Sequence, residues 1–231
     1  MAAAISDFGL ALSPRRRLVL YGSGGVGVEA YDLARQLPEE RRYEDVVFLD
    51  DVAEGETDGA PILRIDQLRP RDSVCVTVSD CRTRSQLVAR CGERSFASLI
   101  ASSTKISSSA TVGEGAIIFD HCLVNAHSRI GRHFICLYYS HISHDCQIGD
   151  FVTFGPRVSC CGAVQIGDGA FVGAGAILKN GSRGRPLRIG TGATIGMGAV
   201  VISDVPEGGV VVGNPARALP LRDAAAAFGI G

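Results

Sequence analysis

Two adjacent residues, His144 and Asp145, have the composition of an acid–base site. A neutral imidazole can accept a proton near pH 7, and a neighbouring carboxylate can orient the ring and stabilise its charged form. A backbone N–H close to both, such as that of Gly162, can stabilise an oxyanion. These groups suit acyl transfer if the fold brings them together. The alternative is that His144 is a partly exposed histidine with no catalytic task.

A second group of chemical interest is the run Gly22-Ser23-Gly24-Gly25-Val26-Gly27, a literal GxGxxG. It stands between an apolar stretch, 18–21, and a stretch with helical spacing, 28–37, which is the context of a phosphate-binding turn. Asp50 and Asp51, about 23 residues after Gly27, could accept hydrogen bonds from a ribose hydroxyl or a base N–H. Alternatively, the glycines serve only to pack strand against helix.

The rest of the first hundred residues completes a small Rossmann-like domain. We expect strands at 18–21, 46–51, 60–63 and 73–80, a helix at 82–91 and a last short strand at 95–100. Arg82 and Arg84 begin the second helix and either meet phosphate or lie on the surface. Only one βαβ half fits before the next region, which favours a mononucleotide or sugar nucleotide over NAD.

The second half of the chain is a repeat of six residues from Ile106 to Val205. A residue that is nearly always apolar returns every sixth position and is usually followed, four residues later, by a small or β-branched one. A fixed short period is typical of a solenoid, and hexads predict a parallel β-helix with coils of about 18 residues. Residues 18 apart then stack about 4.8 Å apart in one column. His144 and Gly162 share such a column at a corner of the coil.

The period is interrupted once. Leu178 is followed by Ile189, 11 residues on rather than 6, so five residues must loop out of the coil. The loop carries Arg183, Arg185 and Arg188 and either folds over an anionic ligand or is a tolerated surface insertion.

These patterns predict α/β plus β architecture in four parts. They are a flexible tail (1–14), a Rossmann-like nucleotide-sugar-binding domain (15–101), a β-helix (102–205), and a C-terminal loop and tail (206–231). The formal charge of −1 and the lack of a long basic run argue against nucleic acid. No stretch reaches the length of a membrane span and the start lacks a signal-peptide pattern, so we expect a cytoplasmic protein.

Cysteine and histidine usage points away from disulfides and metal. Four of the eight cysteines occupy hexad positions that face the coil interior, which predicts buried free thiols: Cys122, Cys136, Cys146 and Cys160. The five histidines crowd into 121–144 but fall in different columns, so we expect no metal site.

The chain resembles the bacterial sugar acetyltransferases of the sialic-acid, bacillosamine and perosamine type, a hexapeptide-repeat family. The resemblance rests on LVLYGSGG, FLDD, VSDCRTR, SHISHDCQIGD, VGAGAIL and VVVGNPAR. It implies a left-handed β-helix, a homotrimer and acetyl-CoA as co-substrate. It also implies that His144 is the general base, that Asp145 is its acidic partner and that the Gly162 N–H faces the thioester carbonyl.

The resemblance extends to binding residues. Acetyl-CoA is expected in a groove between subunits, along Gly162, Gly173, Ala174, Gly196, Met197, Gly213 and Pro215. The nucleotide part of the substrate is expected at Gly22, Ser23, Gly24, Asp50 and Asp51.

Our leading hypothesis is an N-acetyltransferase for a nucleotide-linked amino sugar, of the 4-amino-dideoxy type, in which the amine attacks the thioester directly. A sugar O-acetyltransferase of the sialic-acid type is the first alternative. The second is a nucleotide-binding trimer without catalysis, because Leu137-Tyr138 stands where many relatives have Asn-Thr. Val26 stands where many relatives have histidine, which bears on the identity of the acceptor.

Overall fold

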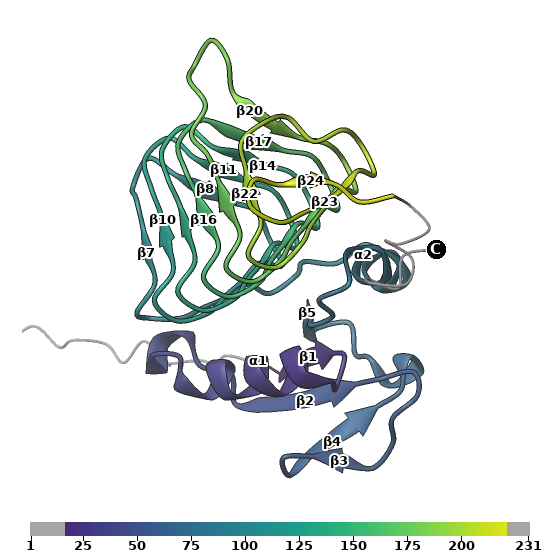
Figure 1. Cartoon of the computed structure of the whole chain (residues 1–231). Coiled ribbons are helices and arrows are strands. Elements are labelled where there is room, and N and C mark those ends of the chain that lie inside the picture. The colour runs from purple at the N-terminus through teal and green to yellow at the C-terminus, as the bar shows by residue number, and fades with distance from the viewer. Residues whose placement is uncertain (1–16, 221–231) are drawn as a thin grey trace, which may run out of the picture.

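The computed structural model describes residues 17–220 and consists of a small α/β domain and a β-helix (Figure 1). The expected tail at 1–14 and the end of the chain, 221–231, lie outside these residues. The α/β domain contains β1 (Arg17–Tyr21), α1 (Gly25–Gln36), η1 (Glu39–Arg41), β2 (Asp45–Leu49), β3 (Glu56–Thr57), β4 (Ala60–Leu63), η2 (Ile65–Gln67), β5 (Ser73–Val76) and α2 (Cys81–Arg90).

The sheet of the α/β domain has the order β3-β4-β2-β1-β5, in which only β3 runs antiparallel to its neighbour. All five residues of β1 are buried because the strand lies at the centre of the sheet. α1 begins three residues before the predicted start, since the Val28 N–H already bonds the Gly24 carbonyl at 3.0 Å. β2 ends at Leu49, so Asp50 and Asp51 follow the strand instead of closing it.

The β-helix is left-handed and triangular, with three parallel sheets along its length. The first contains β7 (Lys105–Ile106), β10 (Leu123–Val124), β13 (His141–Ile142), β16 (Ser159–Cys160), β19 (Ile177–Leu178) and β22 (Val200–Val201). The second contains β8 (Thr111–Val112), β11 (Arg129–Ile130), β14 (Gln147–Ile148), β17 (Val164–Ile166) and β20 (Leu187–Ile189). The third contains β6 (Leu99–Ile100), β9 (Ile117–Ile118), β12 (Ile135–Cys136), β15 (Thr153–Phe154), β18 (Phe171–Val172), β21 (Thr194–Ile195), β23 (Val210–Val212) and β24 (Arg217–Ala218).

The hexad prediction is confirmed residue by residue. Every residue of the hexad series lies in a strand and faces the interior of the coil, where most are fully buried. Strands pair with a shift of 18, as His141 opposite Leu123 illustrates. Across the insertion, Val164 pairs with Leu187, so the register jumps by five residues while the coil continues. The four predicted interior cysteines are buried and free.

The repeat extends beyond both expected ends of the coil. Leu99 and Ile100, predicted to end the α/β domain, pair with β9 and form the first strand of the third sheet. At the other end, β23 continues that sheet beyond Val205, with Thr194 opposite Val210.

The two domains share a hydrophobic core. α1 residues Ala30 and Leu33 pack with Leu99, Ile117 and Ile135 on the outer face of the third sheet. Figure 1 shows α1 between the α/β sheet and the coil. The α/β domain therefore covers the third sheet and lies away from the corner between the first and second sheets, which is opposite it in the triangle.

Candidate active site

His144 and Asp145 occupy the turn between β13 and β14, at the corner that joins the first and second sheets. His144 Nδ1 lies 2.9 Å from Asp145 Oδ2, and the histidine side chain is 66% exposed. The hydrogen bond from His144 is the main cause that lowers the pKa of Asp145, so the carboxylate is ionised and accepts from Nδ1–H. Nε2 is then the unprotonated nitrogen and can act as a base.

Gly162 lies against that free nitrogen, one coil further on. A Cβ at position 162 would approach His144 Nε2 to 2.7 Å, so only glycine leaves the imidazole in place. The Gly162 carbonyl accepts from Gly181 N at 2.9 Å, whereas its N–H has no hydrogen-bond partner within residues 17–220. The structure therefore brings together a free imidazole nitrogen and an unpaired N–H, as the column arithmetic predicts.

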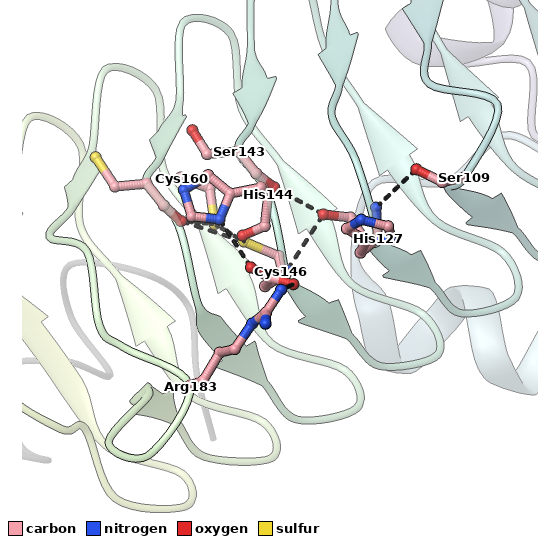
Figure 2. Close-up of polar contacts among 10 residues, drawn as sticks. Ser109, His127, Ser143, His144, Cys146, Cys160 and Arg183 are labelled. Carbon is pink, nitrogen blue, oxygen red and sulfur yellow. Dashed lines mark hydrogen bonds and ion pairs between the residues drawn. The ribbon is translucent and has the colours of Figure 1, made fainter.

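The insertion reaches the same corner. Arg183 lies 3.4 Å from Asp145 Oδ1, on the carboxylate oxygen that His144 does not use (Figure 2). A cavity of about 180 Å³ opens beneath the loop. Its lining includes His127, Asp145, Ala163 and Arg183.

The residues predicted to bind acetyl-CoA fall on two corners. Gly173-Ala174 and Gly196-Met197 stack on successive coils at the corner between the third and first sheets, and Met197 is 75% exposed there. Gly213 joins them, because its carbonyl accepts from Val200 N at 3.0 Å, and Pro215 follows through a cis peptide bond. Gly162 is on the corner between the first and second sheets. The first sheet therefore separates Gly162 from the other residues predicted to bind acetyl-CoA.

The glycine turn combines a packing role with an open surface. Gly22 adopts φ +117°, and a Cβ at Gly27 would lie 2.0 Å from the Gly22 carbonyl oxygen, so both are required for strand–helix packing. A Cβ at Gly24 or Gly25 would contact nothing within 4 Å. Packing thus explains Gly22 and Gly27. Gly24, the N-cap of α1, and Gly25, its first residue, leave the N-terminal N–H groups of the helix open to a ligand.

Asp50 and Asp51 both have partners inside the domain. Asp50 Oδ2 accepts from Ser23 N at 3.0 Å and from Ser23 Oγ at 2.8 Å. Burial raises the pKa of Asp50, but the hydrogen bonds from Ser23, Val52 and Ala53 outweigh it and lower the pKa to about 2. Asp51 accepts from Tyr21 Oη and Arg90. Asp50 therefore holds the turn through Ser23, whereas Asp51 links the end of β1 to α2. No hydrogen bond or ion pair joins the turn to His144 within residues 17–220.

Comparisons with known proteins agree with this architecture. Residues 17–91 match the PglD N-terminal domain. The chain is 37% identical to GDP-perosamine N-acetyltransferase of Escherichia coli O157:H7 over 208 residues, which are 86% of this chain and 94% of that protein. The chain belongs to the family of GDP-perosamine N-acetyltransferase.

Two solved structures of acetyltransferases share the whole fold. The acetyltransferase domain of PglB from Neisseria gonorrhoeae FA1090, in complex with acetyl coenzyme A, is 30% identical with a TM-score of 0.81, covering 89% of this chain and all of that one. PerB from Caulobacter crescentus, in complex with CoA and GDP-perosamine, is 26% identical with a TM-score of 0.77. The match covers 92% of this chain and 100% of that one.

One expectation for the acetyltransferase is wrong. Arg84, which we expected either to meet phosphate or to lie on the surface, is fully buried and donates to carbonyls of both domains, including Val78 at 2.7 Å, His133 at 2.9 Å and Phe151 at 2.7 Å. It holds α2 to two coils of the β-helix. A helix N-terminus rich in arginine does not reveal this role, because the β-helix carbonyls of His133 and Phe151 are 49 and 67 positions away in the sequence.

Two other histidines of the acetyltransferase, His133 and His121, pack against aromatic rings. His133 is 1% exposed, stacks on Phe151 at 5.0 Å, and leaves Nδ1 without a partner. Burial lowers the pKa of His133 to about 4. His121 stacks on Tyr139. Within residues 17–220, no three histidine, cysteine or acidic side chains are grouped to hold a metal ion, and no helix is long and apolar enough to cross a bilayer.

Proposed function

We propose that the protein transfers an acetyl group from acetyl-CoA to the amine of a nucleotide-linked amino sugar, of the 4-amino-dideoxy type. The observation that carries the proposal is the pairing of the free His144 Nε2 with the unbonded Gly162 N–H. The relatives support the substrates, since one is named for GDP-perosamine and another binds both CoA and GDP-perosamine.

The reaction follows from these two groups. The sugar amine attacks the thioester carbonyl carbon and forms the C–N bond, while His144 Nε2 takes the amine proton. The Gly162 N–H donates to the oxyanion of the tetrahedral intermediate. The C–S bond then breaks, and the proton held by His144 passes to the departing sulfur. The products are an N-acetylated sugar and CoA with a free thiol.

The acetyl donor is proposed to bind along the corner of Gly173, Ala174, Gly196, Met197, Gly213 and Pro215, with Gly162 at its reactive end. We propose that residues 15–101 bind the nucleotide through Gly22, Ser23, Gly24, Asp50 and Asp51, and that Asp50 also orders the turn through its hydrogen bonds with Ser23. In one chain the α/β domain covers the sheet opposite the His144 corner. A homotrimer would place one subunit's turn near another's His144, and we propose that assembly.

The test is release of free thiol from acetyl-CoA across a panel of UDP-, dTDP- and GDP-linked amino sugars. We expect release with at least one amine and a product stable to mild base, as an amide is. A base-labile product would indicate an ester and O-acetylation. Thiol release with none of the panel would favour the non-catalytic trimer. A reaction dependent on acetyl-CoA would also agree with the cytoplasmic location that the sequence predicts.

A further inference from the structure

The Asp145 carboxylate is held from both sides. Its Oδ2 accepts from His144 Nδ1 at 2.9 Å, and its Oδ1 lies 3.4 Å from a guanidinium nitrogen of Arg183. Figure 2 shows Arg183 extending from the neighbouring loop toward the pair. The carboxylate therefore bridges the imidazole and a cation that lies outside the regular repeat.

The loop that carries Arg183 is ordered and attached to the site. Ser182 and Arg185 exchange two backbone hydrogen bonds of 3.0 Å, which closes a tight turn around Arg183 and Gly184. Just before the turn, the Gly181 N–H donates to the Gly162 carbonyl. The insertion is thus tied by a hydrogen bond to Gly162, the residue that lies against His144 Nε2. This anchoring fixes where position 183 can lie.

The charges around the pair make Arg183 distinctive. The other titratable groups on the packed elements are His127 one coil earlier, the Cys146 thiol inside the corner, and Cys161 on the next coil. Within residues 17–220, Arg183 is the one cation besides His144 that contacts this carboxylate. Arg185, two residues on, forms no ion pair within residues 17–220. The loop therefore carries one arginine in an ion pair, Arg183, and one without.

We propose that Arg183 is a positioning residue of the reaction, which holds Asp145 in the orientation that directs His144 Nε2 at the amine. This rests on the proposed function of His144 as the base. A carboxylate with one oxygen on a guanidinium cannot rotate away from the imidazole without losing both contacts.

The experiment compares Arg183→Ala, Arg183→Lys and, as the matched control, Arg185→Ala, which removes the same charge from the same turn. First, the imidazole N–H signal of His144 is followed by NMR in the substrate-free protein, with His144→Asn to assign it. We expect the Nδ1–H signal to weaken and move in Arg183→Ala, because an Asp145 carboxylate without the guanidinium holds the imidazole less firmly. The Arg185→Ala and Arg183→Lys spectra should stay close to wild type.

Second, kcat and KM are measured with acetyl-CoA and with acetyl-pantetheine, a donor without the nucleotide. We expect Arg183→Ala to lower kcat about threefold to tenfold with both donors, because a misplaced base costs rate whatever the donor. If the wild type itself releases no thiol, the proposed function fails, and the NMR comparison still tests the Arg183–Asp145 contact.

Two results would overturn the proposal. An unchanged His144 Nδ1–H signal in Arg183→Ala would show that the guanidinium does not act on the pair. A raised KM for acetyl-CoA alone, with acetyl-pantetheine unaffected, would instead assign Arg183 to a phosphate of the donor.

Discussion

Two corners of the same coil each carry a histidine and an aspartate, but their carboxylates bind different partners. We call residues 143–146 and 161–164 the site corner, and residues 131–134, 149–152 and 167–170 the ladder corner. In the ladder corner, Asp150 Oδ1 accepts from Arg132 N at 2.7 Å, and Asp168 Oδ1 accepts from Asp150 N at 2.8 Å. Each carboxylate caps the amide of the preceding coil.

The site corner departs from this arrangement at two positions. His144 stands six residues before Asp150 and Gly162 six before Asp168, at the same place in the hexad. With no carboxylate at position 162, the His144 N–H stays uncapped within residues 17–220, and Asn180, 18 residues after Gly162, does not cap the Gly162 N–H. The carboxylate of this corner is instead one position after His144, at Asp145, where it contacts the imidazole and caps no amide. A one-residue displacement thus separates a structural ladder from a histidine–aspartate pair.

The largest effect should come from His144→Asn. We expect kcat to fall by about 10²–10⁴-fold, the usual contribution of a general base, with an unchanged melting temperature because the side chain is exposed. Thiol release and thermal unfolding check the two parts. His121→Asn is the control, since His121 stacks on Tyr139 at a different corner. Near-normal turnover in His144→Asn would remove the site corner from the mechanism.

Gly162→Ala should have the next largest effect. The added Cβ would press on His144 Nε2 from 2.7 Å and displace the ring, so we expect kcat to fall about 10–10²-fold. Gly184→Ala adds the same methyl group where nothing lies within 4 Å and should leave kcat unchanged. Equal rates for the two variants would mean that the corner tolerates a side chain at 162 and that the glycine is not needed there.

The buried histidine of the ladder corner should make stability depend on pH. Its pKa is lowered to about 4 by burial, against 6.5 in the unfolded chain, so the unfolded state binds the proton first. The neutral His133 ring therefore makes its full contribution to the free energy of unfolding above pH 6.5. That contribution is lost as pH falls toward 4, by up to about 3 kcal/mol for this pKa shift. Urea unfolding of His133→Leu should lose this slope, whereas His127→Leu, at an exposed position, should keep it.

The coil and the position of His144 beside Gly162 could be predicted from the sequence because the repeat is local. Each hexad fixes its own strand and corner, so the register that joins His144 to Gly162 can be counted along the chain. The same count would place Asn180 in their column and so predict that the insertion leaves the site corner. Tertiary partners could not be counted. Arg84 meets carbonyls of the other domain, and Arg183 reaches Asp145 only through the turn at 182–185.

The smallest effects separate the two aspartates. Asp150→Ala should lower the free energy of unfolding by about 1–2 kcal/mol, because the Arg132 amide loses its cap, and should leave kcat within twofold of wild type. Asp145→Ala should do the reverse, with kcat about tenfold lower and unfolding nearly unchanged, since its carboxylate orients a ring and caps no amide. Chemical denaturation and thiol release on both variants give the comparison. If both lost stability and kept activity, Asp145 would be one more capping residue, and the difference between the corners would lie in His144 and Gly162 alone.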